Sequence, residues 1–329
     1  MKRQNGVALI TVLLVVAVVT VVCAGLIARQ QLSIRSSANQ LHVTQAWHYA
    51  LGGETLAKAM LERDLRHGDP RQPVDHLLEP WARPLTFPLD EGGELRVRIV
   101  DPNGRFNLNS LVRQGRPNEL AVLRLRRLLL RLGIDKPYAE RLLDWLDSDS
   151  ELQGGNGAED GQYLLATPPY RTANREITDV SELRLLLEME EADYRRLLPF
   201  VSALPSEALL NVNTASAMVL SSLSDGLSPD AAMSLIAGRG AEGYPSAAAF
   251  AAQPALAGLG EQVVQGLAVG SQYFEVFSEV SLGERRVVLR SLLQRSNDGQ
   301  VSVLARDLGQ GGMPPRLIEE EQELSLIHI

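Results

Sequence analysis

The chain has few of the residues on which many catalytic and metal sites depend. One cysteine, Cys23, stands among 329 residues, which excludes a disulfide framework and a zinc site built from cysteines. The five histidines lie before residue 77 or at position 328. The middle of the chain therefore has no histidine for a catalytic triad or a metalloenzyme centre.

Positive charge is also scarce. Lys+Arg number 32 against 40 Asp+Glu, which gives a formal charge of −8, and only Lys2, Lys58 and Lys136 are lysines. This balance argues against a general nucleic-acid binder, whose basic surface releases phosphate counterions. With 45% hydrophobic and 22% charged residues, the chain is neither a polytopic membrane protein nor disordered, and its length suits one large or two modest folded units.

What the chain does have is one long uncharged, mostly apolar run, residues 7–28. As a helix with a rise of about 1.5 Å per residue, it is long enough to cross a hydrocarbon core of about 30 Å. Lys2 and Arg3 precede it, so the positive-inside rule predicts a cytoplasmic amino end and an exported body. A cleaved signal peptide has a shorter apolar core of about 7–15 residues, and a lipoprotein signal needs a small residue where Val22 stands. A plain signal anchor remains the alternative.

Residues 29–66 keep helical character beyond the apolar run. Apolar positions that include Leu41, Ala50 and Leu61 predict a stripe that packs on a soluble body. Gly52 and Gly53 could kink this helix. A coiled-coil stalk is the alternative, but sustained heptads are absent.

Two distant regions have the alternation of half-buried strands. Five prolines between residues 70 and 88 predict an extended loop over 68–88, and a strand follows at 94–101. The second region, residues 273–308, contains three candidate strands separated by turn sequences. Glu275, Glu279, Arg286 and Arg290 suit a solvated face of these strands. The long, mostly helical sequence between the two regions indicates an inserted domain.

The insert contains three approximate repeats of helix, short turn and helix. The third, near residues 209–239, resembles a helix-hairpin-helix module, in which Asn213 and Thr214 are placed to cap the first helix. Such modules often bind DNA phosphates at a helix start. The hairpin here keeps only Gly226, so a packing scaffold is the favoured interpretation and DNA binding the alternative.

Six acidic residues lie between positions 144 and 160 with no basic residue among them. Alternating carboxylates at Asp147, Asp149 and Glu151, followed by a glycine-rich turn, can supply several of the oxygens that Ca²⁺ requires, although the spacing is not that of an EF-hand. Glu159 and Asp160 are the expected further contributors, with Asn174 as another oxygen donor. A solvated acidic loop, a cluster of helix caps and a glycosidase carboxylate pair are the alternatives.

The amino-terminal arrangement is typical of one group of proteins. A short basic leader that ends in glycine, directly before the apolar run, resembles the signal of type IV pilins and type II secretion pseudopilins. The resemblance implies that a prepilin peptidase cleaves between Gly6 and Val7 and methylates Val7. Most pilins have glutamate fifth in the mature chain, whereas this chain has Thr11, a departure associated with one minor pseudopilin. With the segment 105–112, the acidic segment and the helical insert, the chain is similar over nearly its full length to the type II secretion minor pseudopilin K (general secretion pathway protein K) family.

The resemblance implies an α+β, pilin-like fold with a long N-terminal transmembrane helix, a small antiparallel sheet and a large all-α domain inserted between strands. The expected parts are a leader (1–6), a transmembrane helix (7–28), its periplasmic continuation (29–66), a β domain (67–104 and 271–310), a helical insert (105–270) and a tail (311–329). Residues 324–329 are suspected not to belong to the natural chain, because an adapter sequence used in sequencing would encode them.

The implied function is that of a non-enzymatic, single-pass inner-membrane protein with a periplasmic body. It would lie at the tip of the periplasmic pseudopilus and nucleate assembly in support of the export of folded proteins. The expected partners are the minor pseudopilins I and J, the major pseudopilin and the prepilin peptidase, with no nucleic acid. Calcium is the expected cofactor. A membrane-anchored DNA-uptake receptor is the alternative.

Overall fold

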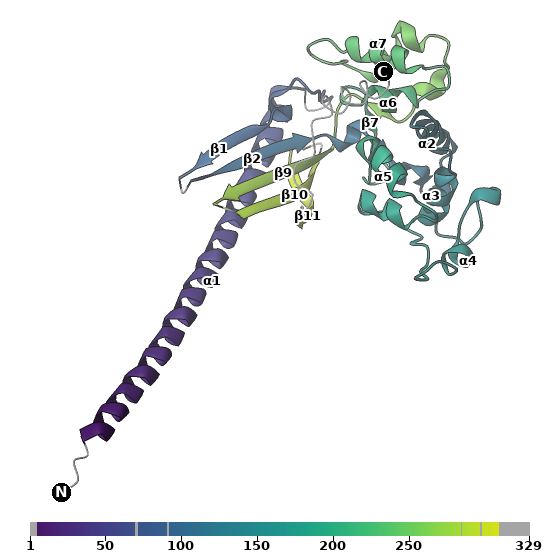
Figure 1. Ribbon diagram of the computed structural model, residues 1–329. Helices are drawn as coiled ribbons and strands as arrows, with labels where there is room; N and C mark the ends of the chain where they lie inside the picture. The colour runs from purple at the N-terminus through teal and green to yellow at the C-terminus, as the bar shows by residue number, and fades with distance from the viewer. Residues whose placement is uncertain (1–4, 70–71, 91, 284, 297, 309–329) are drawn as a thin grey trace.

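The computed structural model describes residues 5–69, 72–90, 92–283, 285–296 and 298–308. Most of the leader and the tail, including residues 324–329, lie outside them. Figure 1 shows a long helix, a sheet packed along its upper half, and a mostly helical lobe beside and beyond the sheet.

The helix α1 (Asn5–His67) has 63 residues, or about 95 Å at 1.5 Å per residue. Every residue from Val7 to Thr44 is exposed. Its amino-terminal part has an 18-residue window with a mean hydropathy of 3.1, none of it buried within the structure. This half of α1 therefore has the length and composition of a single membrane anchor.

Five antiparallel strands form the sheet, in the order β1-β2-β9-β10-β11. They are β1 (Leu85–Leu89), β2 (Gly93–Val100), β9 (Tyr273–Leu282), β10 (Arg285–Arg295) and β11 (Val301–Leu308). β2 and β9 are direct neighbours, with Val97 opposite Ser278, although the whole insert separates them in the chain. The α+β class and the insertion between strands are confirmed.

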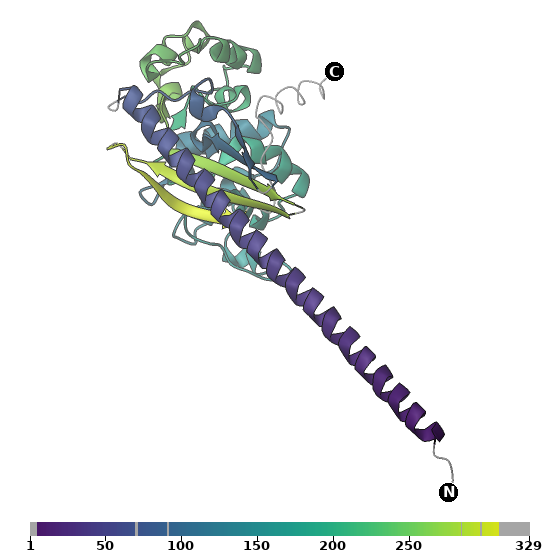
Figure 2. The ribbon, with the colours of Figure 1, turned by 90° about the vertical axis from the view of Figure 1, so that its left-hand side faces the viewer.

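The second half of α1 packs against one face of this sheet, as Figure 2 shows. Small residues line the contact: Ala46, Ala50 and Ala57 are fully buried. Gly53 approaches so closely that an added Cβ would lie 2.6 Å from Ser278 Oγ and 2.9 Å from Val97 Cγ2. The helix continues unbroken through this glycine pair, so the second glycine serves close packing and the predicted kink is wrong.

Three features of the sheet domain differ from the sequence prediction. Residues 85–89 form the edge strand β1 instead of a loop, because Pro88 needs no ladder partner for its nitrogen on the outer side of an edge strand. Leu41 is 65% exposed and lies outside the packed stripe. Glu275 and Glu279 are buried and pair with Arg290 and Arg286, so they do not form a solvated face.

The insert is mostly helical. Its α-helices are α2 (Glu119–Arg131), α3 (Tyr138–Leu146), α4 (Asp160–Tyr163), α5 (Glu191–Leu197), α6 (Ala217–Ser221), α7 (Pro229–Ala237) and α8 (Ala247–Ala251). Six short 3-10 helices lie among them: η3 (Leu108–Leu111), η4 (Gly154–Asn156), η5 (Val180–Leu185), η6 (Leu198–Phe200), η7 (Pro254–Leu256) and η8 (Glu261–Val264). Two more, η1 (Pro80–Ala82) and η2 (Pro102–Gly104), precede the insert.

Short strand pairs also occur in the insert, so it is not purely helical. They are β3 (Phe106–Asn107) with β6 (Val201–Ser202), β4 (Val112–Arg113) with β5 (Arg116–Pro117), and β7 (Leu210–Asn211) with β8 (Leu267–Ala268). The insert has its own large apolar core, separate from the core between α1 and the sheet.

Candidate functional site

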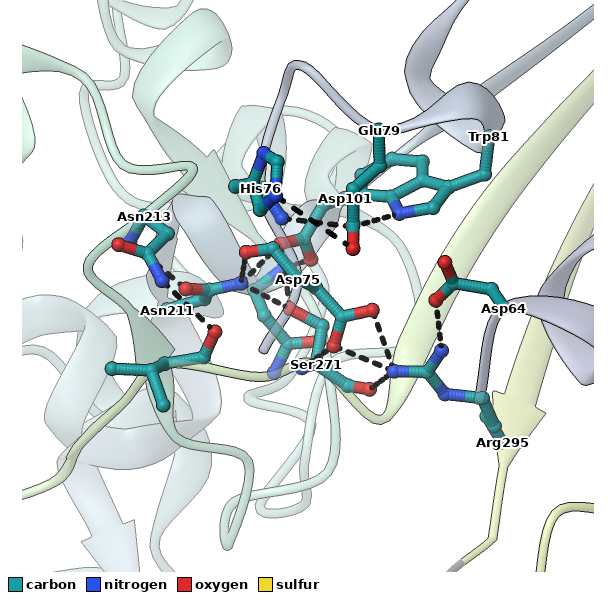
Figure 3. Close-up of polar contacts among 12 residues, drawn as sticks. Asp64, Asp75, His76, Glu79, Trp81, Asp101, Asn211, Asn213, Ser271 and Arg295 are labelled. Carbon is teal, nitrogen blue, oxygen red and sulfur yellow. Dashed lines mark hydrogen bonds and ion pairs between the residues drawn. The ribbon is translucent and has the colours of Figure 1, made fainter. Parts of the chain in front are cut away.

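A buried polar network joins α1, the sheet and the insert (Figure 3). Arg295, at the end of β10, binds both carboxylate oxygens of Asp75, at 2.7 and 2.5 Å. Its other terminal nitrogen lies 3.1 Å from Asp64 of α1. The side chains of Arg295 and Asp75 are only 2% and 1% exposed. This arginine therefore supplies a permanent internal cation for two carboxylates.

Asp101 occupies the centre of the same network. It accepts hydrogen bonds from Thr214 Oγ1 (2.5 Å), Ser271 Oγ (2.6 Å), Asn211 Nδ2 (3.1 Å) and Asn103 N (2.8 Å). Complete burial nevertheless raises the pKa of Asp101 to about 6. Since these donors come from both sides of the insertion point, the network fixes the insert to the sheet domain.

Glu79 is the remaining acid of the junction. Its carboxylate accepts from the backbone nitrogen of His76 and from Trp81 Nε1. Burial raises the pKa of Glu79 to about 7. Oxygens of Glu79, Asp64 and Asp75 lie within 4.8 Å of one another. Arg295 pairs with the two aspartates, and the donors from His76 and Trp81 bind Glu79, so the group already has partners within the chain.

Two predicted helix caps belong to the junction instead. Ser216 caps α6 through the backbone nitrogen of Val219. Asn213 holds the backbone of Tyr244, donating to its carbonyl and accepting from its nitrogen, and Thr214 binds Asp101 as described above. The prediction that Asn213 and Thr214 cap this helix is wrong, because both side chains are drawn into buried tertiary contacts.

The acidic loop lies at the opposite side of the insert, after α3. Asp147 follows the last residue of that helix, and Glu159 is the N-cap of α4. One carboxylate oxygen each from Asp147, Asp149 and Glu159 lie within 4.8 Å of one another. The structure thus brings together three of the predicted calcium ligands from two sides of a loop.

Several oxygens around this group lack partners. Both carboxylate oxygens of Asp147, Oε1 of Glu159 and Oδ1 of Asn174 are buried and accept no hydrogen bond from the described residues. Asn174 is held by its amide nitrogen, which donates to the carbonyl of Asp149 at 3.0 Å. Because buried oxygens are almost always satisfied, this donor-free set of oxygens fits a bound hard cation.

The pKa values of these acids agree with that interpretation. Burial, then repulsion from Asp149 and Asp144, raises the pKa of Asp147 to about 6. Burial, then repulsion from Asp144 and Asp147, raises the pKa of Glu159 to about 7. A divalent cation among the carboxylates would remove the repulsion and favour their charged forms.

Asp144 was not among the predicted ligands, yet it shapes the loop. Its fully buried carboxylate accepts from the backbone nitrogen of Gln153 at 3.1 Å. Gly157 lies against it so closely that an added Cβ would overlap the Asp144 carboxylate. The glycines after Glu151 therefore permit a tight turn around Asp144, a role that their sequence neighbours do not reveal.

Two predicted ligands lie apart from the group. Asp160 accepts from the nitrogen and hydroxyl of Thr172, at 3.1 and 3.0 Å, and pairs with Arg171. Glu151 is exposed, and it is its backbone nitrogen that contacts Asp149 Oδ1, at 2.8 Å. The carboxylates of Glu151 and Asp160 are thus not part of the three-acid group.

The residues of the predicted processing site lie at the other end of the molecule. Gly6 and Val7 are in the first turns of α1, and Val7 is 64% exposed. The hydroxyl of Thr11 donates to the carbonyl of Ala8 at 2.9 Å. This internal bond satisfies Thr11 within its own helix, as an apolar surrounding requires.

The helix-hairpin-helix-like unit is docked on α2. Arg131 donates to carbonyls of Ser221, Ser224 and Leu227, and Arg127 binds Asp225 with both nitrogens of its fork. The hairpin between α6 and α7 is therefore occupied by arginines of the same chain, which supports the packing-scaffold interpretation.

The long anchor, the helix-backed antiparallel sheet and the helical lobe inserted between β2 and β9 define a pilin-like protein with an enlarged head. Comparisons agree: residues 104–206 and 210–270 match two family models described as type II secretion system (T2SS), protein K. The chain belongs to the type II secretion system protein K family, so the resemblance inferred from the sequence is confirmed.

Relatives match over nearly their whole length. The type II secretion system protein K of Pseudomonas aeruginosa is 61% identical over 95% of both chains. That of Klebsiella pneumoniae is 38% identical over 89% of this chain and 93% of its own. Among solved structures, the crystal structure of the GspK-GspI-GspJ complex from enterotoxigenic Escherichia coli superposes with a TM-score of 0.74 at 31% identity, over 84% of this chain and 99% of that chain.

Proposed function

We propose that this minor pseudopilin lies at the tip of a periplasmic pseudopilus, primes its assembly and supports the export of folded proteins across the outer membrane. One observation carries the proposal: the inserted lobe lies at the end of α1 far from the amino terminus and projects to one side (Figures 1 and 2). A fibre stacks its subunits along their helices, so a lobe of this size is accommodated best where no subunit lies above it.

Thr11 supports the same place in the fibre. Its hydroxyl is bound within α1, and it carries no charge to pair with the amino terminus of a neighbour. A subunit at the top has no further subunit above it to align by such a pair. We therefore expect a subunit at the tip to function with the uncharged Thr11 at this position.

The partners proposed are the minor pseudopilins I and J, together with the major pseudopilin below them. Support comes from the solved relative, which forms a complex with two other proteins of its secretion system and is covered over 99% of its length. The exposed part of α1 contains the apolar run of residues 7–28, which offers a surface on which helices of other subunits can pack.

Location is tested by labelling. With an epitope tag placed in the exposed Gly115 turn between β4 and β5, gold particles should mark one end of each isolated pseudopilus. Label distributed along the fibre would contradict the tip position. Copurification of the full chain with I and J, but not with the major pseudopilin alone, should accompany the end label.

We further propose an inner-membrane location with processing by the prepilin peptidase between Gly6 and Val7. Mass spectrometry of the chain expressed with and without the peptidase should show a mature protein that begins at a methylated Val7 only when the peptidase is present. Gly6→Leu should block cleavage, whereas Ala8→Leu, two residues away within the apolar run, should not. An intact Met1 in the presence of peptidase would contradict this proposal.

Calcium is the cofactor we propose for the acidic loop. Asp147, Asp149 and Glu159 would hold it, with the side-chain oxygen of Asn174 as a further ligand, and the ion would tie the end of α3 to the start of α4. Calorimetric titration of the full chain with Ca²⁺ should show a site that disappears in Asp147→Ala/Asp149→Ala. The exposed control Asp135→Ala should bind like the unmodified chain; equal binding by the double variant would refute the assignment.

A further inference from the structure

A second, oppositely charged site lies in the insert. A cavity of about 110 Å³ is formed at the start of α2 by Arg105, Arg113, Asn118, Arg124 and Gln265, among others. Its volume is several times the roughly 30 Å³ of one water molecule and well below the 300 Å³ or more of sites for larger ligands. Three arginines line it, and no lining residue is acidic.

Arg124 brings a buried charge to this cavity. The residue is 8% exposed, and its terminal nitrogens donate to the carbonyls of Gln262, Val263 and Gln265 at 2.9–3.0 Å. Its Nε is buried and has no acceptor. Burial, then repulsion from Arg127 and Arg113, lowers the pKa of Arg124 to about 10. The surroundings of this arginine therefore lack negative charge.

The other two arginines are also without a carboxylate. The side chain of Arg105 makes no hydrogen bond or ion pair with any residue that the structure describes, and its Nε is buried. Arg113 donates its Nε to the carbonyl of Ser206 at 3.2 Å and, within the described ranges, has no acidic partner. Cations brought together in this way repel one another unless an anion lies between them.

Two other arginines of α2, Arg126 and Arg127, are paired with acids, unlike the three arginines of this cavity. Arg127, one turn along α2 from Arg124, binds Asp225 through both carboxylate oxygens at 2.8 and 2.7 Å. The cavity beside Arg126 contains Asp135 and Glu140. The chain thus neutralises Arg126 and Arg127 with its own acids, whereas no acidic residue lines this cavity.

We propose that this cavity binds one small oxyanion, of the size of sulfate or phosphate, between Arg105, Arg113 and the Nε side of Arg124. Guanidinium groups present paired N–H donors that match the oxygens of such ions. The first turn of α2, capped by Asn118, adds backbone N–H groups and the positive end of the helix dipole. The bound anion would join α2 to the segments at Arg105 and Gln265 and so stiffen the insert.

The test uses the full chain in detergent, titrated with sodium sulfate against sodium chloride of equal ionic strength. Calorimetry should show saturable sulfate binding at one site, and the thermal midpoint should rise and level off over the same concentrations. Arg105→Gln should weaken the sulfate affinity by about tenfold or more, because one charged contact is lost. Arg113→Gln provides a second variant at the same cavity.

Arg116→Gln is the matched control, since Arg116 is exposed and lies outside the cavity. It should bind sulfate like the unmodified chain. Without sulfate, Arg105→Gln should have a thermal midpoint equal to or above that of the unmodified chain, because it relieves repulsion. If sodium acetate competes with sulfate, carboxylates share the site. If acetate does not compete, the site selects tetrahedral ions.

Three outcomes would overturn the proposal. The first is that sulfate raises the thermal midpoint no more than chloride does. The second is that Arg116→Gln loses sulfate binding as fully as Arg105→Gln. The third is that Arg105→Gln lowers the thermal midpoint in chloride.

Discussion

Two groups of three carboxylates lie among the residues that the structure describes, and their surroundings are opposite. At the junction, Asp75 is bound at both oxygens by Arg295, which also reaches Asp64. In the acidic loop, both oxygens of Asp147 and one of Glu159 are buried with no donor among the described residues. In both groups, one carboxylate oxygen from each acid lies within 4.8 Å of the others. The comparison teaches that a group of acids with buried members points to a metal only where the chain supplies no cation of its own.

The junction should show the largest effect when its cation is removed. Arg295→Met removes the cation that pairs with the buried Asp75 and the partly buried Asp64, which should lower the free energy of unfolding by about 3–5 kcal/mol. Urea unfolding of the full chain measures this loss. Arg285→Met, at the exposed start of the same strand, should change the free energy of unfolding little. Equal losses of stability in the two variants would show that Arg295 has no special role for the carboxylates of the junction.

Calcium should produce the next largest effect, and only through the loop. At a free concentration one hundred times the dissociation constant, the ion should raise the free energy of unfolding by about 2.7 kcal/mol. Asp147→Asn should abolish most of this rise, whereas Arg295→Met should retain it. A calcium response that survives in Asp147→Asn would place the ion elsewhere.

The pH dependence of the loop should be opposite with and without calcium. Glu159 has a pKa of about 7 against a usual value of 4.5, so the folded chain holds this proton more tightly than the unfolded chain. Without calcium, lowering the pH from 7.5 to 4.5 should stabilise the unmodified chain by about 1–2 kcal/mol relative to Glu159→Gln.

With calcium bound, the same acidification should lower the calcium affinity and with it the free energy of unfolding, because protons compete with the ion for the carboxylate ligands. Paired unfolding curves at both pH values measure these differences. A pH response identical in the unmodified chain and Glu159→Gln would contradict the raised pKa.

Asp160 should show the smallest effect. Its carboxylate is bound to Thr172 and Arg171, so Asp160→Asn should change calcium affinity by less than about threefold. Asp149→Asn, which removes an oxygen of the three-acid group, should weaken it by about tenfold or more. Calorimetry compares the calcium affinities of the two variants directly. A larger loss of affinity in Asp160→Asn than in Asp149→Asn would show that Asp160 is a ligand.

Parts of the site could be found from sequence because their signal is local. The run of acids from Asp144 to Asp160, free of basic residues, identified the loop, and Asp147, Asp149 and Glu159 were among the predicted ligands. Choosing among the acids was not possible from spacing. Thr172 donates a hydrogen bond to Asp160, and the backbone nitrogen of Gln153 donates one to Asp144. Both contacts depend on how the loop turns.

Other errors have the same origin. The five prolines predict a loop up to residue 88, whereas Pro88 lies in the edge strand β1, where an edge position accommodates it. Gly53 was expected to bend α1, although its role is set by Ser278 and Val97 on strands far away in the chain. The arginine cavity was not foreseen, since Arg105 and Arg124 come together only when the loop before η3 folds against α2.

The sequence by itself determined the anchor, the family and the α+β class with a helical insertion between strands, because each depends on local composition and order. An apolar run of this length identifies a candidate membrane helix from composition alone, and alternating apolar residues give strands wherever one face can be buried. Only the tertiary structure decided which charges meet. Partners such as Asp75 and Arg295 are 220 positions apart in the chain, and electrostatic and hydrogen-bond energies depend on separations of a few ångströms that no sequence spacing specifies.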